Sequence, residues 1–304
     1  MTEISSQAVP GMNPIKPDQN RLRQKIEEME ELPTLPGIVM RVLSLASDEN
    51  VTARKMKEVI LTDPPLSAKV LKVANSSFFA RREKTDSIDQ AIVTIGLNEL
   101  VNICVSTGMI DALDSWEEKH LHRADIWRHS LSTAFLAKSL GLRKDMQKPG
   151  SPDLFLCGLL HNIGWIVVDQ IMHEELGPLL ESAENGEEWT LEKEKQYLGL
   201  DHAEIGSIFL KKWGLPDEVC QVVQYHHNPD GASDFAPEAA LIGLATTLSP
   251  IKFEPDIHVK SVSSHIPHLL VQTSGNAALR EMEERYAANI NQAQAMADRM
   301  MSYI

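Results

Sequence analysis

The sequence predicts an all-α protein, a multi-helix bundle with an N-terminal helical lobe followed by a second helical lobe. After residue 20, apolar residues recur at the three- and four-residue spacing of a helix face in almost every segment. No window shows sustained alternation of apolar and polar residues between turn signals, which is the pattern of a half-buried strand. The 304 residues, 43% of them hydrophobic, are enough to bury such a core.

Composition limits the partners and the compartment. The formal net charge of −14, from 29 basic and 43 acidic side chains, offers no attraction to nucleic acid or to an anionic membrane, so we expect neither as a partner. The three cysteines form no CxxC pair and the N-terminus lacks a signal peptide pattern, which together indicate a cytoplasmic protein. The most apolar stretch, 154–168, is shorter than the roughly 20 residues of a membrane span, and we expect it to be a buried helix.

The N-terminal lobe is expected over residues 21–113, after a loose polar tail at 1–20. The segment LPTLPGIVMRVLSLAS predicts a helix with one apolar face, formed by Val39, Val42, Leu43 and Ala46.

Two further helix boundaries in this lobe can be read from the sequence. In TDPPLSAKVLKVANSSFF, Asp63 is the predicted N-cap and Pro64 the first helical residue. The buried stripe of that helix is expected to consist of Leu66, Val70 and Val73. The segment SIDQAIVTIGLNELVNICVS is expected to form two short helices that separate at Gly96.

The second lobe, over residues 114–250, is expected to contain four helical segments that each carry a histidine. The first, RADIWRHSLSTAFLAKSLGL, is apolar on two faces, so it should be central rather than surface-lying. His129 is on one of these faces and is expected to point inward.

His161 lies in LLHNIGW, within the predicted buried helix. Burying an imidazole costs free energy unless the ring finds a partner. Cys157 is four residues earlier on the same face, so a Cys–His ligand pair is one interpretation, and a plain core cysteine is the other.

The positions of the remaining candidate histidines are predicted from where their helices begin and end. Asp201 and Glu204 form a predicted capping box, which makes His202 the first helical residue, where the positive helix end favours neutral imidazole. In PDEVCQVVQYHH, His226 continues the apolar stripe, whereas His227 is expected to point about 100° away from it.

One core-facing histidine is usually a hydrogen-bonded core residue, but four on successive helices suggest that the rings meet at one buried point. Neutral imidazole binds divalent metals, so the candidate ligands are His129, His161, His202, His226 and His227. Hydrolysis at a metal pair also needs a bridging carboxylate, and Asn162 next to His161 offers only an amide oxygen. The sequence requires no cofactor, and one divalent ion (Zn, Fe, Mn or Ni) held by the histidines is the candidate.

Residues 251–304 are expected to form a loop to about 275 and then an amphipathic C-terminal helix over 276–302. The apolar stripe of this helix consists of Leu279, Met282, Tyr286, Ile290, Ala293, Ala297 and Met300. We expect the stripe to pack on its own domain, and the alternative is the seam of a homodimer.

Several ordered motifs resemble those of the HDOD family, bacterial relatives of the HD-superfamily phosphohydrolases. The motifs are LPTLP, DPPLSAKVLKVANSSFF, SIDQAIVTIGLNELVN, WRHS, GLLHNIG, DHAEIGSIFLKKWGLP and YHH, and they cover roughly residues 25–250. The resemblance implies an all-helical module, HD-like in its second lobe, that acts in bacterial signal transduction as an output or interaction domain.

The resemblance also implies a degenerate metal site. HD enzymes hold metal with a His, a His-Asp pair and a later Asp, and the matching positions here are His129, His161-Asn162 and Thr246. Both carboxylates are therefore absent.

A second set of positions is similar to the binuclear HD-GYP phosphodiesterases. His202, with His226 or His227, resembles their additional ligands, and Asp230-Gly231 resembles their HH…DG pattern. The Gly-Tyr-Pro that should follow is absent, which speaks against cleavage of a cyclic dinucleotide.

Two main functions follow from these observations, and a small-ligand sensor or another binding role is the remaining alternative. The first is a non-catalytic signalling module that meets a protein partner, which the sequence does not identify. The second is a metal-dependent phosphohydrolase acting on a phosphoester or nucleotide, which needs a carboxylate from elsewhere in the chain. The nearest in sequence are Asp169, Asp201 and Glu204, and no catalytic residue is assigned.

Overall fold

The structure is a computed structural model that describes residues 24–26, 28, 33, 35–48, 50–75, 85–142, 151–249 and 276–302. Within these ranges every regular element is a helix, which confirms the predicted all-α fold class. The tail predicted at 1–20 and the loop predicted over 251–275 lie outside the described residues, and the predicted lobe boundaries stay predictions.

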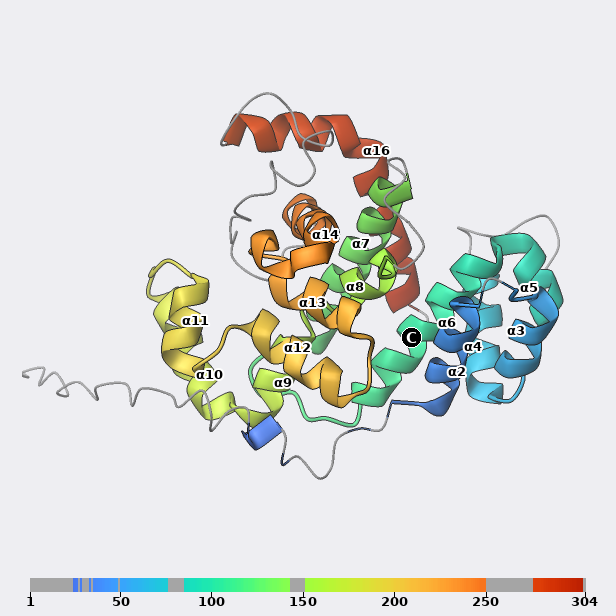
Figure 1. The fold of residues 1–304 in the computed structure, drawn as a ribbon, viewed down its shortest axis with the longest axis horizontal. Helices are drawn as coiled ribbons and strands as arrows, with labels where there is room; N and C mark the ends of the chain where they lie inside the picture. Colours follow the sequence, from blue (N-terminus) through green and yellow to red (C-terminus); the bar gives the residue numbers. More distant parts are fainter. Residues whose placement is uncertain are drawn as a thin grey trace, which may run out of the picture.

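Five helices from the first part of the chain pack on one another at one side of the molecule (Figure 1). They are α2 (Gly37–Ala46), α3 (Ala53–Ile60), α4 (Pro64–Ala74), α5 (Ile88–Ile95) and α6 (Leu97–Leu113). Aliphatic and Met side chains make their shared core. The predicted apolar face of α2 is only partly right, because Val39 and Val42 are buried but Ala46, at the helix end, is exposed.

The helix ends in this group follow from local chemistry. Asp63 caps α4, since its Oδ1 accepts a hydrogen bond from the backbone N–H of Leu66 at 3.0 Å, and Pro64 is the first helical residue, as predicted. Gly96 has a φ of 88°, a left-handed conformation that glycine adopts without strain. It separates α5 from α6 where predicted, and the two helices are bent by 114°. The helix α6, with 17 residues, is longer than the short helix expected.

The second group of helices surrounds α7 (Arg123–Leu142), against which α8, α9 and α14 pack. Its other elements are α8 (Leu154–Leu160), α9 (Ile163–Ile171), α10 (His173–Glu184), α11 (Leu191–Leu198), α12 (His202–Lys212), α13 (Asp217–Tyr225), the 3-10 helix η1 (Pro229–Phe235) and α14 (Ala236–Leu248). Arg123 links the two groups, because its guanidinium donates to the backbone carbonyls of Leu113 and Trp116, at and just beyond the end of α6. The α10–α11 pair lies at the edge of the molecule (Figure 1).

The most apolar stretch of the chain forms the core of this second group. Residues 154–171 have a mean hydropathy of 1.5, sufficient in length and composition for a membrane span, yet 89% of the stretch is buried inside the protein. The prediction of one continuous helix here is wrong. The helix α8 ends at Leu160 and α9 begins at Ile163, so His161 is the C-cap of one helix and Asn162 the N-cap of the next.

The C-terminal helix α16 (Asn276–Met301) packs on α7 and α14 (Figure 1). Of its predicted stripe, Met282, Tyr286, Ile290, Ala293, Ala297 and Met300 are buried, and the side chain of Leu279 lies outside the described residues. The stripe is thus covered within one chain, as the packing interpretation expects. A homodimer through this helix stays a prediction.

Candidate metal centre

Five imidazole rings gather at one buried place in the second group of helices, and we call them the histidine cluster. Its members are His129, His161, His202, His226 and His227, none more than 4% exposed. Ring centroids lie 5.2 Å apart for His129 and His161, and 5.1 Å apart for His161 and His226. The centroids of His202 and His226 are 5.6 Å apart. The rings therefore meet at one locus, as hypothesised from sequence, and their binding of a metal stays a prediction.

Three members come closer still. One ring nitrogen each from His202, His226 and His227 lies within 4.8 Å of the others. His227, a candidate ligand expected to point about 100° away from the apolar stripe of its helix, also lies in the cluster: its ring centroid is 4.0 Å from that of His226 and 5.1 Å from that of His202.

Hydrogen bonds to backbone carbonyls fix which nitrogen of two rings carries the proton. Nδ1 of His161 lies 2.8 Å from the carbonyl oxygen of Gly158, and Nδ1 of His226 lies 2.7 Å from that of Val223. A carbonyl oxygen only accepts, so both Nδ1 atoms donate, and in the neutral ring Nε2 keeps its lone pair. Those lone pairs are what a divalent ion binds.

His202 is oriented by a buried carboxylate that sequence analysis missed. Oε2 of Glu194 lies 2.8 Å from Nδ1 of His202 and accepts the backbone N–H of the same residue at 2.9 Å. Its Oε1 accepts from Nε1 of Trp189 at 2.9 Å. Trp165 also stacks on the His202 ring, with centroids 4.8 Å apart and an interplanar angle of 16°. Such carboxylate–histidine contacts set the tautomer of metal-binding imidazoles.

Burial favours the neutral form of His161 and His227. It lowers the pKa of His161 well below its usual value, and the neighbouring His226 and His129 lower it further. The pKa of His227 is lowered by burial and then by His226 and His202. Neutral imidazole is the form that coordinates metal.

Two glycines let the helices that carry the histidine cluster pack backbone against backbone. A Cβ on Gly164 of α9 would lie 1.9 Å from the carbonyl oxygen of His202, so α9 and α12 meet backbone to backbone. A Cβ on Gly158 of α8 would lie 2.6 Å from Cα of Ala134 in α7. Neither position accepts a side chain without moving a helix that carries part of the cluster.

The other predicted positions add no charged ligand to the cluster. Asn162 is fully buried beside His161, and Thr246 is buried on α14. Asp230 is exposed on η1. Burial raises the pKa of the Cys157 thiol well above its usual value, which disfavours the thiolate that a metal needs and favours a plain core cysteine.

The three carboxylates considered for completing an enzyme site are used elsewhere. Asp169 accepts the backbone N–H groups of Lys119, His120 and Leu121. Asp201 and Glu204 form the capping box at the start of α12, as predicted. In the part of the chain that the structure describes, the close set of candidate ligand atoms contains only imidazoles. This donor set fits one borderline ion such as Zn or Fe, and lacks the bridging carboxylate of a two-metal site.

Comparison with known families agrees with this architecture. The model of the HDOD domain family matches residues 32–229, which is more than half of the sequence. The chain belongs to the HDOD family. The HDOD match spans α2 to α13 and so includes all five members of the histidine cluster.

Solved structures share the fold of this HDOD chain. An HDOD domain protein from Geobacter sulfurreducens has a TM-score of 0.75 and 23% identity, and the match covers 93% of this chain and 99% of that one. A protein from Shewanella amazonensis described as a candidate phosphohydrolase has a TM-score of 0.68 and 23% identity, over 92% and 97% of the two chains. A protein from Marinobacter aquaeolei described as a candidate signal transduction protein has a TM-score of 0.68 and 22% identity, over 93% and 65%.

A protein of Treponema pallidum is 28% identical over 247 residues. That alignment covers 80% of this HDOD chain and 47% of the relative. The chain thus spans about half the length of the curated relative it matches.

Proposed function

We propose that this HDOD chain is a non-catalytic output or interaction module of bacterial signal transduction, built around a degenerate metal site and acting in the cytoplasm. The signalling role is supported by family membership and by the likeness to the Marinobacter aquaeolei protein described as a candidate signal transduction protein. Its partner is a signalling protein that the chain meets through its surface.

The observation that carries the non-catalytic part is the absence of an anionic ligand. Within the described residues, His202, His226 and His227 are grouped without a carboxylate, and the nearest one, on Glu194, already accepts from three donors. In metal-dependent hydrolysis of a phosphate ester, the metal site supplies a bound nucleophile and stabilises the developing charge. Neutral imidazoles can hold one ion, but they do not bridge two.

The test is a hydrolysis assay on the full chain. The chelator-treated protein is loaded with Mn²⁺, Fe²⁺ or Zn²⁺ and offered p-nitrophenyl phosphate and bis(p-nitrophenyl) phosphate. We expect turnover no faster than with the free ion, together with a metal-dependent rise in the melting temperature, because an ion that binds only the folded state stabilises it. Metal-dependent turnover that disappears in His161→Ala would overturn the proposal.

A metal-dependent phosphohydrolase is the second candidate, and one observation favours it. Three neutral imidazoles close together resemble the three-ligand sites that leave a fourth position open for water. His202, His226 and His227 would then hold the ion, which when bound lowers the pKa of water and polarises a phosphoryl oxygen. The same assay separates the two functions, since only this one predicts turnover.

A further inference from the structure

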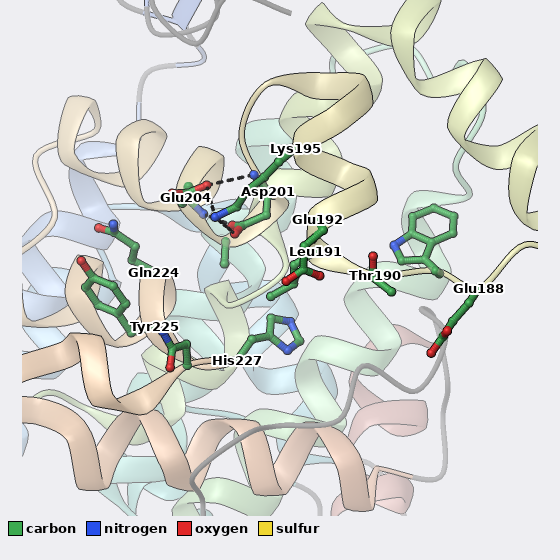
Figure 2. A pocket seen from close by; sticks show the side chains of 13 residues that line it. Glu188, Thr190, Leu191, Glu192, Lys195, Asp201, Glu204, Gln224, Tyr225 and His227 are labelled. Atoms are coloured by element: carbon green, nitrogen blue, oxygen red, sulfur yellow. Dashed lines mark hydrogen bonds and ion pairs between the residues drawn. The ribbon is translucent and has the colours of Figure 1, made fainter. Parts of the chain in front are cut away.

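A pocket of about 470 Å³ includes His227 of the histidine cluster in its lining (Figure 2). Its walls come from the segment 188–192 at the start of α11, from the first turn of α12, and from residues 224–228 at the end of α13. This volume is in the range of pockets that hold small organic ligands. The pocket is therefore large enough for a molecule and not only for an ion.

The charge of the lining is strongly negative. Four carboxylates, on Glu188, Glu192, Asp201 and Glu204, face one ammonium group, that of Lys195. Nζ of Lys195 is 3.0 Å from Oδ2 of Asp201 and 3.1 Å from Oε2 of Glu204, so its charge is already compensated (Figure 2). Glu188 and Glu192 form no ion pair with any residue that the structure describes. Such a lining attracts cations and repels phosphate.

The inner wall of the pocket includes His227, a polar side chain only 4% exposed. Its Nε2 lies 3.2 Å from Nε2 of His202. His202 donates from Nδ1 to Glu194, so its Nε2 is an acceptor, and the donor in this contact is Nε2 of His227. Nδ1 of His227 then carries a lone pair, and it has no hydrogen-bond partner among the described residues.

A buried acceptor without a partner is costly, and a ligand that donates an N–H group removes that cost. We propose that this pocket binds a small organic cation, an ammonium or guanidinium compound, which lies between Glu188 and Glu192 and donates a hydrogen bond to Nδ1 of His227. The proposal concerns the metal-free protein, in which Nε2 of His227 carries the ring proton. It does not depend on whether the chain hydrolyses phosphate esters.

The proposal is tested by calorimetry on the chelator-treated full chain at low ionic strength, with agmatine as the probe and inorganic phosphate as the comparison. We expect agmatine to bind and phosphate not to bind. Glu188→Gln and Glu192→Gln should each weaken agmatine binding about two- to fivefold, the range for one exposed charge. Glu184→Gln is the matched control, since Glu184 is exposed at the end of α10 and does not line the pocket.

A second readout reports on the buried acceptor directly. The ¹⁵N resonance of His227 Nδ1, assigned by its loss in His227→Gln, should shift toward the value of a hydrogen-bonded nitrogen when agmatine is added. The capped peptide acetyl-Ala-Arg-Ala-amide tests whether the pocket instead binds an arginine side chain of a protein partner. We expect this peptide to bind more weakly than agmatine. Equal agmatine affinity in the Glu188→Gln/Glu192→Gln double variant and the wild type, binding of phosphate, or tighter binding of the peptide would each contradict the proposal.

Discussion

The two helix groups of this HDOD chain bury very different side chains. Among the described residues of α2–α6, the buried polar groups are Asn102, Ser106 and Thr107, all of them uncharged. The group from α7 to α14 buries five imidazoles, several carboxylates and the guanidinium of Arg123. An apolar core is sufficient for folding, so the polar core of the second group is a cost that folding does not require. That contrast is the physical reason to locate the function in the second group.

The largest expected effect is the loss of stability in acid. The pKa values of His161 and His227 are lowered in the folded protein, so below about pH 6.5 the unfolded chain binds protons that the folded chain excludes. Stability is therefore complete above pH 6.5 and falls by about 1.4 kcal/mol per pH unit for each ring until its folded pKa is reached. As the pH falls from 6.5 to 5, the metal-free protein should therefore lose unfolding free energy.

Hydrogen exchange locates that loss. Opening free energies in α8 and α13, next to the histidine cluster, should fall at pH 5, whereas α4, which has no buried imidazole, should change less. Urea unfolding with a midpoint independent of pH between 7.5 and 5 would show that the rings are solvated and protonate freely.

The next largest effect concerns the carboxylate that holds His202. Glu194→Ala leaves two buried N–H donors of His202 and one of Trp189 without their acceptor, which should destabilise the protein by about 3 kcal/mol. Chemical denaturation measures the change. Glu194→Gln is the control, because its amide oxygen preserves one acceptor at nearly the same volume and should lose less. Equal losses in both variants would mean that charge rather than hydrogen bonding holds this contact.

Two glycine variants compare the helix groups directly. Gly164→Ala directs a methyl group at the backbone of His202 in α12, whereas Gly108→Ala in α6 meets the side chain of Val39, with Cγ2 at 2.1 Å. A side chain can repack but a helix backbone must shift, so we expect about 2 kcal/mol of destabilisation for Gly164→Ala and less than about 1 kcal/mol for Gly108→Ala. Zinc affinity should fall only in Gly164→Ala, because only that change displaces His202. A matching loss of zinc affinity in Gly108→Ala would indicate general loosening.

Sequence patterns predicted the parts of this molecule that local chemistry determines. The capping box of Asp201, the N-cap of Asp63 and the break at Gly96 each follow from a few adjacent residues. The inward face of His129 followed from helical spacing.

What the sequence could not give is long-range placement. Glu194 lies in LEKEKQYL, where nothing distinguishes it from the exposed Glu192 two residues earlier. Its burial depends on how α11 docks beside α12, and the contact of Gly164 with α12 likewise involves residues far apart in the chain. Helical periodicity also separated His227 from the apolar stripe of His226, although the two ring centroids lie 4.0 Å apart in the folded chain.

The smallest expected effect is that of Asn162→Asp, which gives the second helix group a carboxylate as an additional candidate metal ligand. Asn162 is fully buried next to His161, and Asn162→Asp changes an amide into a carboxylate with almost no change in volume. A buried carboxylate without a cation destabilises the fold, so the metal-free variant should unfold more easily than the wild type. Because the anion is a much stronger ligand than the amide, zinc should bind at least about tenfold more tightly, or about 1.4 kcal/mol, and restore the lost stability. Calorimetry with Zn²⁺ measures the first and thermal unfolding the second. Unchanged affinity would mean that residue 162 does not face the ion position, and the similarity to the His-Asp pair of HD enzymes would then hold in sequence but not in the geometry of the site.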